Sequence, residues 1–151
     1  MFLLTYLLTD FWKWAGINSE QFARIADPTS LVEPFYYPRF NELRNSCKNM
    51  INKALDNQET DDFLTCLALD SEEELILTWC IELGNDVFVN KLIEQGCTHL
   101  QPEARWQIVE LIHNRGNDSQ IAYLKHLCND SNPYVKKRAQ NTVCEYCERK
   151  L

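Results

Sequence analysis

The sequence predicts an all-α protein, a short right-handed array of antiparallel helical hairpins behind an N-terminal helical cap. Apolar residues recur at spacings of three and four along most of the chain, which is the pattern of helices with one buried face. Four glycines and five prolines are few for a β protein rich in tight turns, and helix starts recur at a constant interval. We expect a single domain over residues 1–151, with N-terminal helices and an aromatic loop in 1–56 and repeated hairpins in 60–151.

The N-terminal region is predicted to begin with two helices. Residues 2–14 have a wide apolar face, Gly16 ends that helix, and Asn18 or Ser19 caps a short second one. The segment from Asp27 to Pro38 contains three prolines and is expected to be an irregular loop that breaks the helical pattern.

The loop carries the aromatic cluster Phe35-Tyr36-Tyr37. Three neighbouring aromatic residues either pack over the edge of a core or form a contact with a protein partner, and the sequence leaves both open. Pro38 is expected in the first turn of a helix that continues to Leu55. The basic side of this helix, which includes Arg44, is expected to be a solvated face.

The central segment is predicted to hold two helices with side-chain caps. Thr60 is expected to cap the first, which places Asp61 and Asp62 in its first turn, where the helix dipole favours negative charge. The run Ser71-Glu72-Glu73-Glu74 matches a Ser-x-x-Glu capping box and is expected to open a second helix that ends at Leu83.

Helix starts repeat along the second half of the chain. Ser71, Pro102 and Pro133 are 31 residues apart, which is the period of one helical hairpin. Single hairpins of this size cannot bury their apolar faces alone, so they stack on their neighbours into a solenoid.

Residues 130–143, with the sequence DSNPYVKKRAQNTV, resemble the second helix of a HEAT repeat. That family shows Asp, then Pro, then Val-Arg, then Ala and an aliphatic residue at this spacing. Lys136 stands where the family usually has arginine, and the unit at Ser71 lacks the proline. The resemblance covers about residues 60–147. It implies a HEAT-like fold but no particular function, because such arrays serve many binding roles.

The negative charge of the chain is concentrated in one segment. The net charge is −7, and residues 54–90 contain ten acidic residues and no lysine or arginine. Residues 1–53 and 91–151 are nearly balanced. Nucleic-acid binding usually needs a clustered basic surface, so no direct nucleic-acid partner is expected. A basic protein fits better, because opposite electrostatic fields speed encounter.

No combination of residues predicts an enzyme, and no cofactor or metal is expected. None of His99, His113 and His126 pairs in sequence with a nucleophile, and there is no glycine-rich phosphate loop. Cys144 and Cys147 form one Cys-x-x-Cys pair, whereas zinc needs four ligands. We expect both thiols on the apolar side of the last helix.

A partner-binding surface on the acidic segment is expected instead. Several of the carboxylates are also explained by helix starts, so a merely solvated face is the alternative. The candidate binding residues are acidic and polar side chains of the central helices, the matching face of the next hairpin and two tyrosines: Asp61, Asp62, Glu72, Glu73, Glu74, Thr78, Glu82, Arg105, Glu110, Tyr36 and Tyr37.

The first ten residues are apolar but lack a basic start and a cleavage site, so a signal peptide is not expected. No run approaches the roughly 18 apolar residues that span a bilayer. The seven cysteines are odd in number and lie mostly in helical patterns, which favours reduced thiols. We therefore expect a cytoplasmic protein without membrane contact.

A small acidic helical array of this kind is similar in character to the immunity proteins of bacterial toxin systems, including contact-dependent growth inhibition, of which some are HEAT-like. The similarity lies in size, acidity and fold type. It implies tight binding to a cognate protein toxin, often a basic nuclease domain, whose phosphate-binding cleft the acidic side chains would cover.

Two other functions stay open. One is a general HEAT-like scaffold or adaptor that binds a protein or peptide. The other is a repeat enzyme similar to DNA glycosylases, which would need a basic groove, and only Lys136-Lys137-Arg138 indicates one.

Overall fold

The structure is a computed structural model that describes residues 3–25 and 33–149. Within these residues it contains nine α-helices, two 3-10 helices and no strand, which confirms the predicted all-α class. The α-helices are α1 (Leu3–Ala15), α2 (Ser19–Arg24), α3 (Phe40–Met50), α4 (Asn57–Leu69), α5 (Leu75–Leu83), α6 (Asp86–Gly96), α7 (Pro102–Arg115), α8 (Ile121–Leu127) and α9 (Pro133–Arg149). The 3-10 helices are η2 (Pro34–Tyr36) and η3 (Asp118–Gln120).

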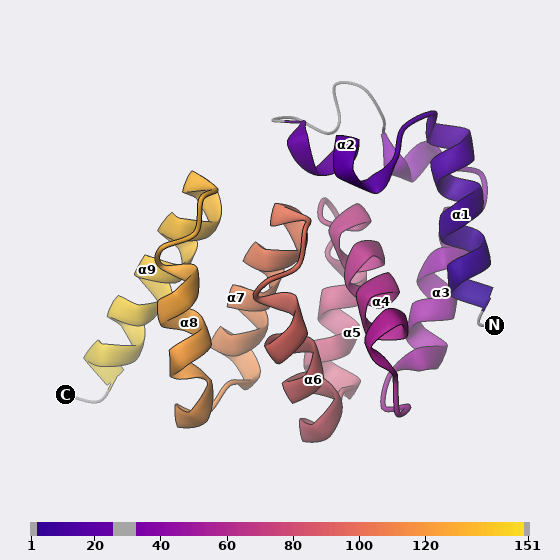
Figure 1. Ribbon diagram of the computed structural model, residues 1–151. Coiled ribbons are helices and arrows are strands. Elements are labelled where there is room, and N and C mark those ends of the chain that lie inside the picture. The colour runs from indigo at the N-terminus through magenta and orange to yellow at the C-terminus, as the bar shows by residue number, and fades with distance from the viewer. Residues whose placement is uncertain (1–2, 26–32, 150–151) are drawn as a thin grey trace.

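The helices succeed one another across the molecule in chain order. Figure 1 shows α1 and α3 at the N-terminal end, α8 and α9 at the C-terminal end, and α2 lying across one end of the row. Contacts join α4 to α6 and α7, α6 to α7, and α9 to both α7 and α8. One hydrophobic core runs through all of them, from Leu4 in α1 to Ala139 in α9.

The N-terminal helices form largely as the sequence indicates. Gly16 adopts a left-handed φ of 72° and ends α1, a conformation that glycine tolerates without strain. Asn18 caps α2 through a reciprocal capping box with Gln21. The expected break at Asp27-Pro28 lies outside the described residues.

Helix α3 is shorter than expected at both ends. Pro38 lies in a turn before it, and the helix ends at Met50 instead of Leu55. Asn52 has a left-handed φ of 70°. Its side-chain amide donates to the carbonyl of Leu83 at 2.9 Å, and its Oδ1 accepts from a backbone N–H at the start of α6. This long-range contact stabilises a turn where helical periodicity alone predicts continuation.

The predicted cap at Thr60 is wrong. Asp56 caps α4, and its carboxylate accepts from the N–H of Glu59 at 2.8 Å. Thr60 is buried inside the helix, where its hydroxyl donates to the carbonyl of Asp56 at 2.7 Å. Asp61 and Asp62 therefore lie beyond the first turn, and the helix dipole gives them less stabilisation than expected.

The predicted capping box at Ser71 is also wrong. Residues 71–73 form a turn, Glu74 has a left-handed φ of 53°, and α5 begins at Leu75. The carboxylate of Asp70 accepts from the N–H of Ile76 at 2.8 Å. A buried carboxylate from the preceding helix thus replaces the serine cap.

Two of the later helices begin at the predicted residues. Pro102 and Pro133 open α7 and α9 as expected, and Leu77, Ile108 and Ala139, which are spaced 31 residues apart, are all buried. Gly96 is the last residue of α6, and a Cβ there would be 2.5 Å from Ile108 Cγ1.

Side chains cap the turn before α8. Asn117 is the cap, and it opens the 3-10 turn η3 that leads into α8. Asn117 and Gln120 form a reciprocal capping box, so both side chains satisfy backbone groups at this start.

Candidate partner-binding site

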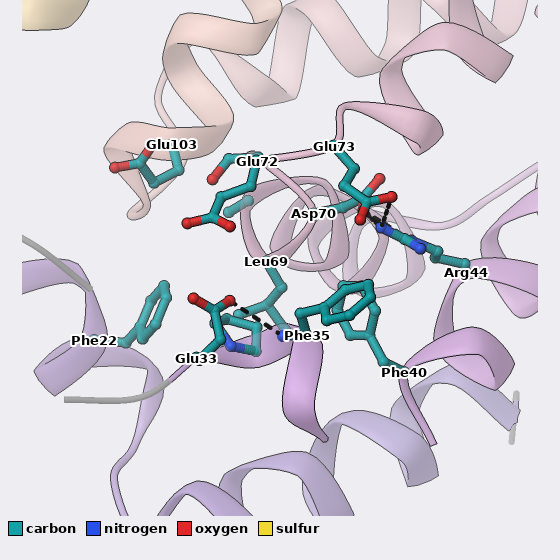
Figure 2. A pocket seen from close by; sticks show the side chains of 13 residues that line it. Phe22, Glu33, Phe35, Phe40, Arg44, Leu69, Asp70, Glu72, Glu73 and Glu103 are labelled. Carbon is teal, nitrogen blue, oxygen red and sulfur yellow. Dashed lines mark hydrogen bonds and ion pairs between the residues drawn. The ribbon is translucent and has the colours of Figure 1, made fainter. Parts of the chain in front are cut away.

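A pocket of about 290 Å³ opens where α2, η2, α3, the α4–α5 turn and the start of α7 meet. We call it the acidic pocket. Its floor is apolar and its rim is acidic (Figure 2). The apolar lining residues are Phe22, Pro34, Phe35, Phe40, Ala68 and Leu69, and the charged ones are Glu33, Arg44, Asp70, Glu72, Glu73 and Glu103. Five carboxylates and one guanidinium give this lining a formal charge of −4.

One wall of the acidic pocket is an internal ion-pair cluster. Arg44 is only 6% exposed, so the expectation that it belongs to a solvated face is wrong. Its guanidinium donates to Asp70 Oδ1 at 2.5 and 2.8 Å and lies 3.3 Å from the carboxylate of Glu73. It also lies 4.6 Å from the centre of the Phe40 ring, which is a cation–π distance.

Two opposed effects act on the pKa of Asp70. Burial raises it above its ordinary value, while the N–H of Ile76 and the guanidinium of Arg44 lower it and compensate only in part. The side chain of Asp70 is fully buried, so its negative charge depends on these two partners. Arg44 therefore neutralises Asp70 inside the fold and leaves the rim carboxylates with their charge.

The rim carboxylates lie on the side of the pocket away from this cluster. Figure 2 shows Glu33, Glu72 and Glu103 on the side where Phe22 lies. Glu33 accepts from the N–H of Phe35 at 3.4 Å, and Glu103 accepts from the indole N–H of Trp106 at 2.7 Å. Among the described residues, no lysine or arginine forms an ion pair with these three glutamates. Their negative charge is therefore available to a partner.

The sequence-predicted residues Glu72 and Glu73 line this pocket, but Asp61 and Asp62 do not. Asp61 Oδ1 lies 3.2 Å from Nε2 of the buried His99. Asp62 is buried and accepts from the hydroxyl of Thr5 at 2.7 Å and from Gln58 at 3.0 Å. Asp62 links α1 to α4 and offers little surface to a partner.

Glu74, Thr78 and Glu82 lie one turn apart along α5, outside the pocket lining. Glu74 is half-buried, whereas Thr78 and Glu82 are exposed. The Thr78 hydroxyl donates to the carbonyl of Glu74 at 2.8 Å, so it satisfies the helix backbone. Glu82 is therefore the exposed carboxylate of this group on α5.

Arg105 and Glu110 are held in ion pairs within the fold. Arg105 donates to both oxygens of Asp130, at 2.8 and 3.1 Å, and to the carbonyl of His99 at 2.8 Å. Glu110 accepts from Arg138 of α9. Both side chains connect α7 to neighbouring parts of the fold, so their charges are explained by these internal ion pairs.

The two tyrosines have opposite environments. Tyr36 is 75% exposed, whereas Tyr37 is 3% exposed. The Tyr37 hydroxyl donates to Asp10 at 2.5 Å, and its ring packs against Phe11 with the centroids 5.3 Å apart. Burial, followed by this hydrogen bond to a carboxylate, raises the pKa of Tyr37. Tyr37 is a core residue, and Tyr36 remains a surface candidate close to the acidic pocket.

Sequence reasoning did not select most residues of this site, among them Phe22, Glu33, Arg44 and Glu103. These four come from separate elements, and no periodic pattern relates them. Glu33 lies in the aromatic loop and Glu103 in the first turn of α7, where an acidic residue is explained by the helix dipole. Only the fold places them around one cavity.

The cysteines and histidines do not assemble a metal centre in the described part of the chain, where no group of three or more candidate ligands occurs. Cys144 and Cys147 are exposed, so the prediction that they face the apolar side of the last helix is wrong. The helix instead turns Val135 and Ala139 to the core. Cys47, Cys66, Cys80 and Cys97 are buried, as predicted from their apolar helical contexts.

None of the helices in residues 3–25 and 33–149 has the length and apolar character required to cross a membrane. Comparisons of the chain with protein-family models, with curated proteins and with solved structures give no match. The functional conclusion therefore depends on the residues and their geometry.

Proposed function

We propose that this chain is a binding protein that neutralises a cognate basic protein toxin, of nuclease type, by covering its active site. The observation that carries the proposal is the acidic pocket, where an apolar floor meets three glutamates that pair with no lysine or arginine of the described residues. Apolar contact area and charge complementarity are the two features that specific protein recognition combines.

The charge distribution supports a basic partner. Residues 54–90 contain no lysine or arginine, and Glu72 and Glu82 form no ion pair with a basic residue of the described chain. A nuclease binds phosphates through lysine and arginine, and carboxylates placed over that cleft would compete for the same groups. This correspondence favours a nuclease over a toxin of neutral surface.

The proposal includes the finer architecture, a short right-handed array of antiparallel hairpins of the HEAT type. The buried equivalents Leu77, Ile108 and Ala139, and the helix starts at Pro102 and Pro133, support it. The start of α5 at Leu75 departs from the 31-residue period, so the first unit is the least regular.

We also propose a non-catalytic role and a cytoplasmic location. His99 contacts Asp61 through Nε2, and its Nδ1 accepts from the N–H of Gln101 at 3.0 Å, so both ring nitrogens have structural partners. Burial, followed by a hydrogen bond with Cys66, raises the pKa of Cys47. Buried thiols with raised pKa values are poor nucleophiles and suit a reducing compartment.

Growth rescue tests the proposal. The C-terminal domain encoded by the gene next to that of this chain is expressed under an inducible promoter, with or without the full chain. We expect growth arrest by the domain alone and rescue by the wild-type chain. Rescue is expected to fail with Glu72→Lys/Glu82→Lys and to persist with the control Glu94→Lys/Glu148→Lys, which reverses two exposed charges outside the lining of the acidic pocket.

Two results would count against the toxin assignment. If the neighbouring gene product is not toxic, the proposal that the partner is a toxin is wrong. If the Glu72→Lys/Glu82→Lys variant rescues growth fully, the acidic surface does not take part in neutralisation. Binding without toxicity would favour the scaffold or adaptor role.

A further inference from the structure

We infer that the acidic pocket receives an arginine side chain of the partner. The inference rests on the proposed function, because the arginine is taken to belong to a basic protein. It depends on three features together: an apolar floor, an aromatic ring that is partly free, and carboxylates at the rim. An arginine has the matching parts, which are an aliphatic stem and a planar cationic end.

The fold already contains one arginine bound in this way. Arg44 lies 4.6 Å from the centre of the Phe40 ring and 5.8 Å from that of Phe35, with Asp70 and Glu73 as its anionic partners. The same pocket also contains carboxylates that this arginine does not pair with. Phe35 is 51% exposed, and Glu33 and Glu72 form no ion pair with a basic residue of the described chain.

The electrostatic balance permits a second guanidinium beside Arg44. Arg44 is neutralised by Asp70, and the lining as a whole keeps a formal charge of −4. Within the described residues, Arg44 is the one basic side chain of the pocket lining. A cation supplied by another molecule would therefore balance the remaining negative charge.

The cavity is large enough to receive a side chain of a partner. Its volume of about 290 Å³ lies near the lower end of the about 300–1,000 Å³ that ligand pockets span. Arginine is preferred to lysine, because its guanidinium is more weakly hydrated, stacks on aromatic rings and binds two carboxylate oxygens at once. A buried arginine at the centre of an interface is a common energetic anchor.

Short peptides test the inference on the full chain without the toxin. Acetyl-Gly-Arg-Gly-amide, its citrulline analogue and its lysine analogue are titrated into labelled protein and followed by two-dimensional NMR. We expect saturable shifts of the amides of Phe35, Leu69 and Glu72, with a dissociation constant for the arginine peptide on the order of millimolar. Citrulline keeps the shape and loses the charge, so it is expected to bind at least about tenfold more weakly.

Matched variants distinguish binding in the acidic pocket from nonspecific attraction to the negative charge of the protein. Glu33→Gln/Glu72→Gln removes two rim charges at nearly constant shape and is expected to weaken the arginine peptide at least about fivefold. Glu94→Gln/Glu148→Gln removes the same charge elsewhere and is expected to change nothing. Both double variants alter residues that are exposed or half-buried, so neither is expected to perturb folding.

Several outcomes would overturn the inference. They are equal binding of the arginine and citrulline peptides, tighter binding of the lysine peptide, shifts confined to another surface, and no saturable shift at about 20 mM peptide. The test is independent of the growth assay. Rescue without peptide binding would retain the proposed function and reject the arginine pocket, whereas peptide binding without rescue would do the reverse.

Discussion

Replacement of Arg44 by methionine is the most informative test of the buried wall of the acidic pocket. The change keeps most of the aliphatic volume over Phe40 and removes the charge that neutralises Asp70, whose side chain is fully buried. Loss of one partner from a buried ion pair costs about 3–5 kcal/mol, because the remaining charge is left without compensation. Domains of this size have about 5–15 kcal/mol of stability, so the variant is expected to fold with a much reduced urea midpoint.

The loss of stability in Arg44→Met is expected to depend on pH in a defined direction. The folded-state pKa of Asp70 already lies above its unfolded value, so in the window between them the folded chain binds more protons than the unfolded chain. Stability from this group therefore falls as pH rises through that window. Without Arg44 the folded pKa rises further and the window widens, so the deficit of Arg44→Met relative to wild type is expected to be larger at pH 7 than at pH 5.

Urea unfolding followed by circular dichroism at both pH values checks these expectations. Arg39→Met is the matched control, because Arg39 pairs with Glu42 at the surface, where water screens the interaction. An Arg44→Met variant that loses less than about 1 kcal/mol would refute the reasoning. A deficit that shrinks as the pH rises would refute it as well.

The remaining predictions concern other buried polar contacts and metal binding. Tyr37→Phe is expected to lower the free energy of unfolding by about 1–3 kcal/mol, because the hydroxyl donates to a carboxylate, whereas Tyr36→Phe changes an exposed side chain and is expected to leave the urea midpoint unchanged. Arg105→Met is expected to cost about 2–4 kcal/mol, because Asp130, whose side chain is only 7% exposed, loses a two-point hydrogen bond; an unchanged midpoint would contradict this. Excess EDTA is expected to leave the helical ellipticity unchanged, since the described residues include no group of three or more candidate ligands, and a clear loss would reveal a structural metal.

Helix content and most helix starts follow from the sequence because their causes are local. The apolar period, the prolines at Pro102 and Pro133, and Gly16 at the end of α1 act within a few residues of the boundary they set. These signals also explain why the equivalent positions Ile108 and Ala139 are both buried.

The starts of α4 and α5 were predicted incorrectly for a physical reason. Ser71 is a good cap by type, but the N–H of Ile76 finds the buried carboxylate of Asp70, which is itself fixed by Arg44 of another helix. A residue type indicates which caps are available, and tertiary contacts decide which one is used.

The candidate site was predicted only in part. The charge pattern indicates Glu72 and Glu73 because they lie in a segment without basic residues. It does not indicate Glu33 or Glu103, which the fold brings to the same rim from distant parts of the chain. It also suggests Asp62, although that carboxylate is satisfied by Thr5 and Gln58 inside the molecule. Charge along a chain thus identifies a region, and burial decides which of its carboxylates can face a partner.

The most direct test of the central claim is the affinity of the chain for the purified domain encoded by the neighbouring gene, measured by calorimetry at about 50 mM and about 300 mM salt. Recognition of a basic surface through the acidic pocket predicts a one-to-one complex that weakens at least about tenfold between the two salt concentrations, and a further loss with Glu33→Gln/Glu72→Gln. An affinity that does not depend on salt, or that the double variant leaves intact, would contradict the claim.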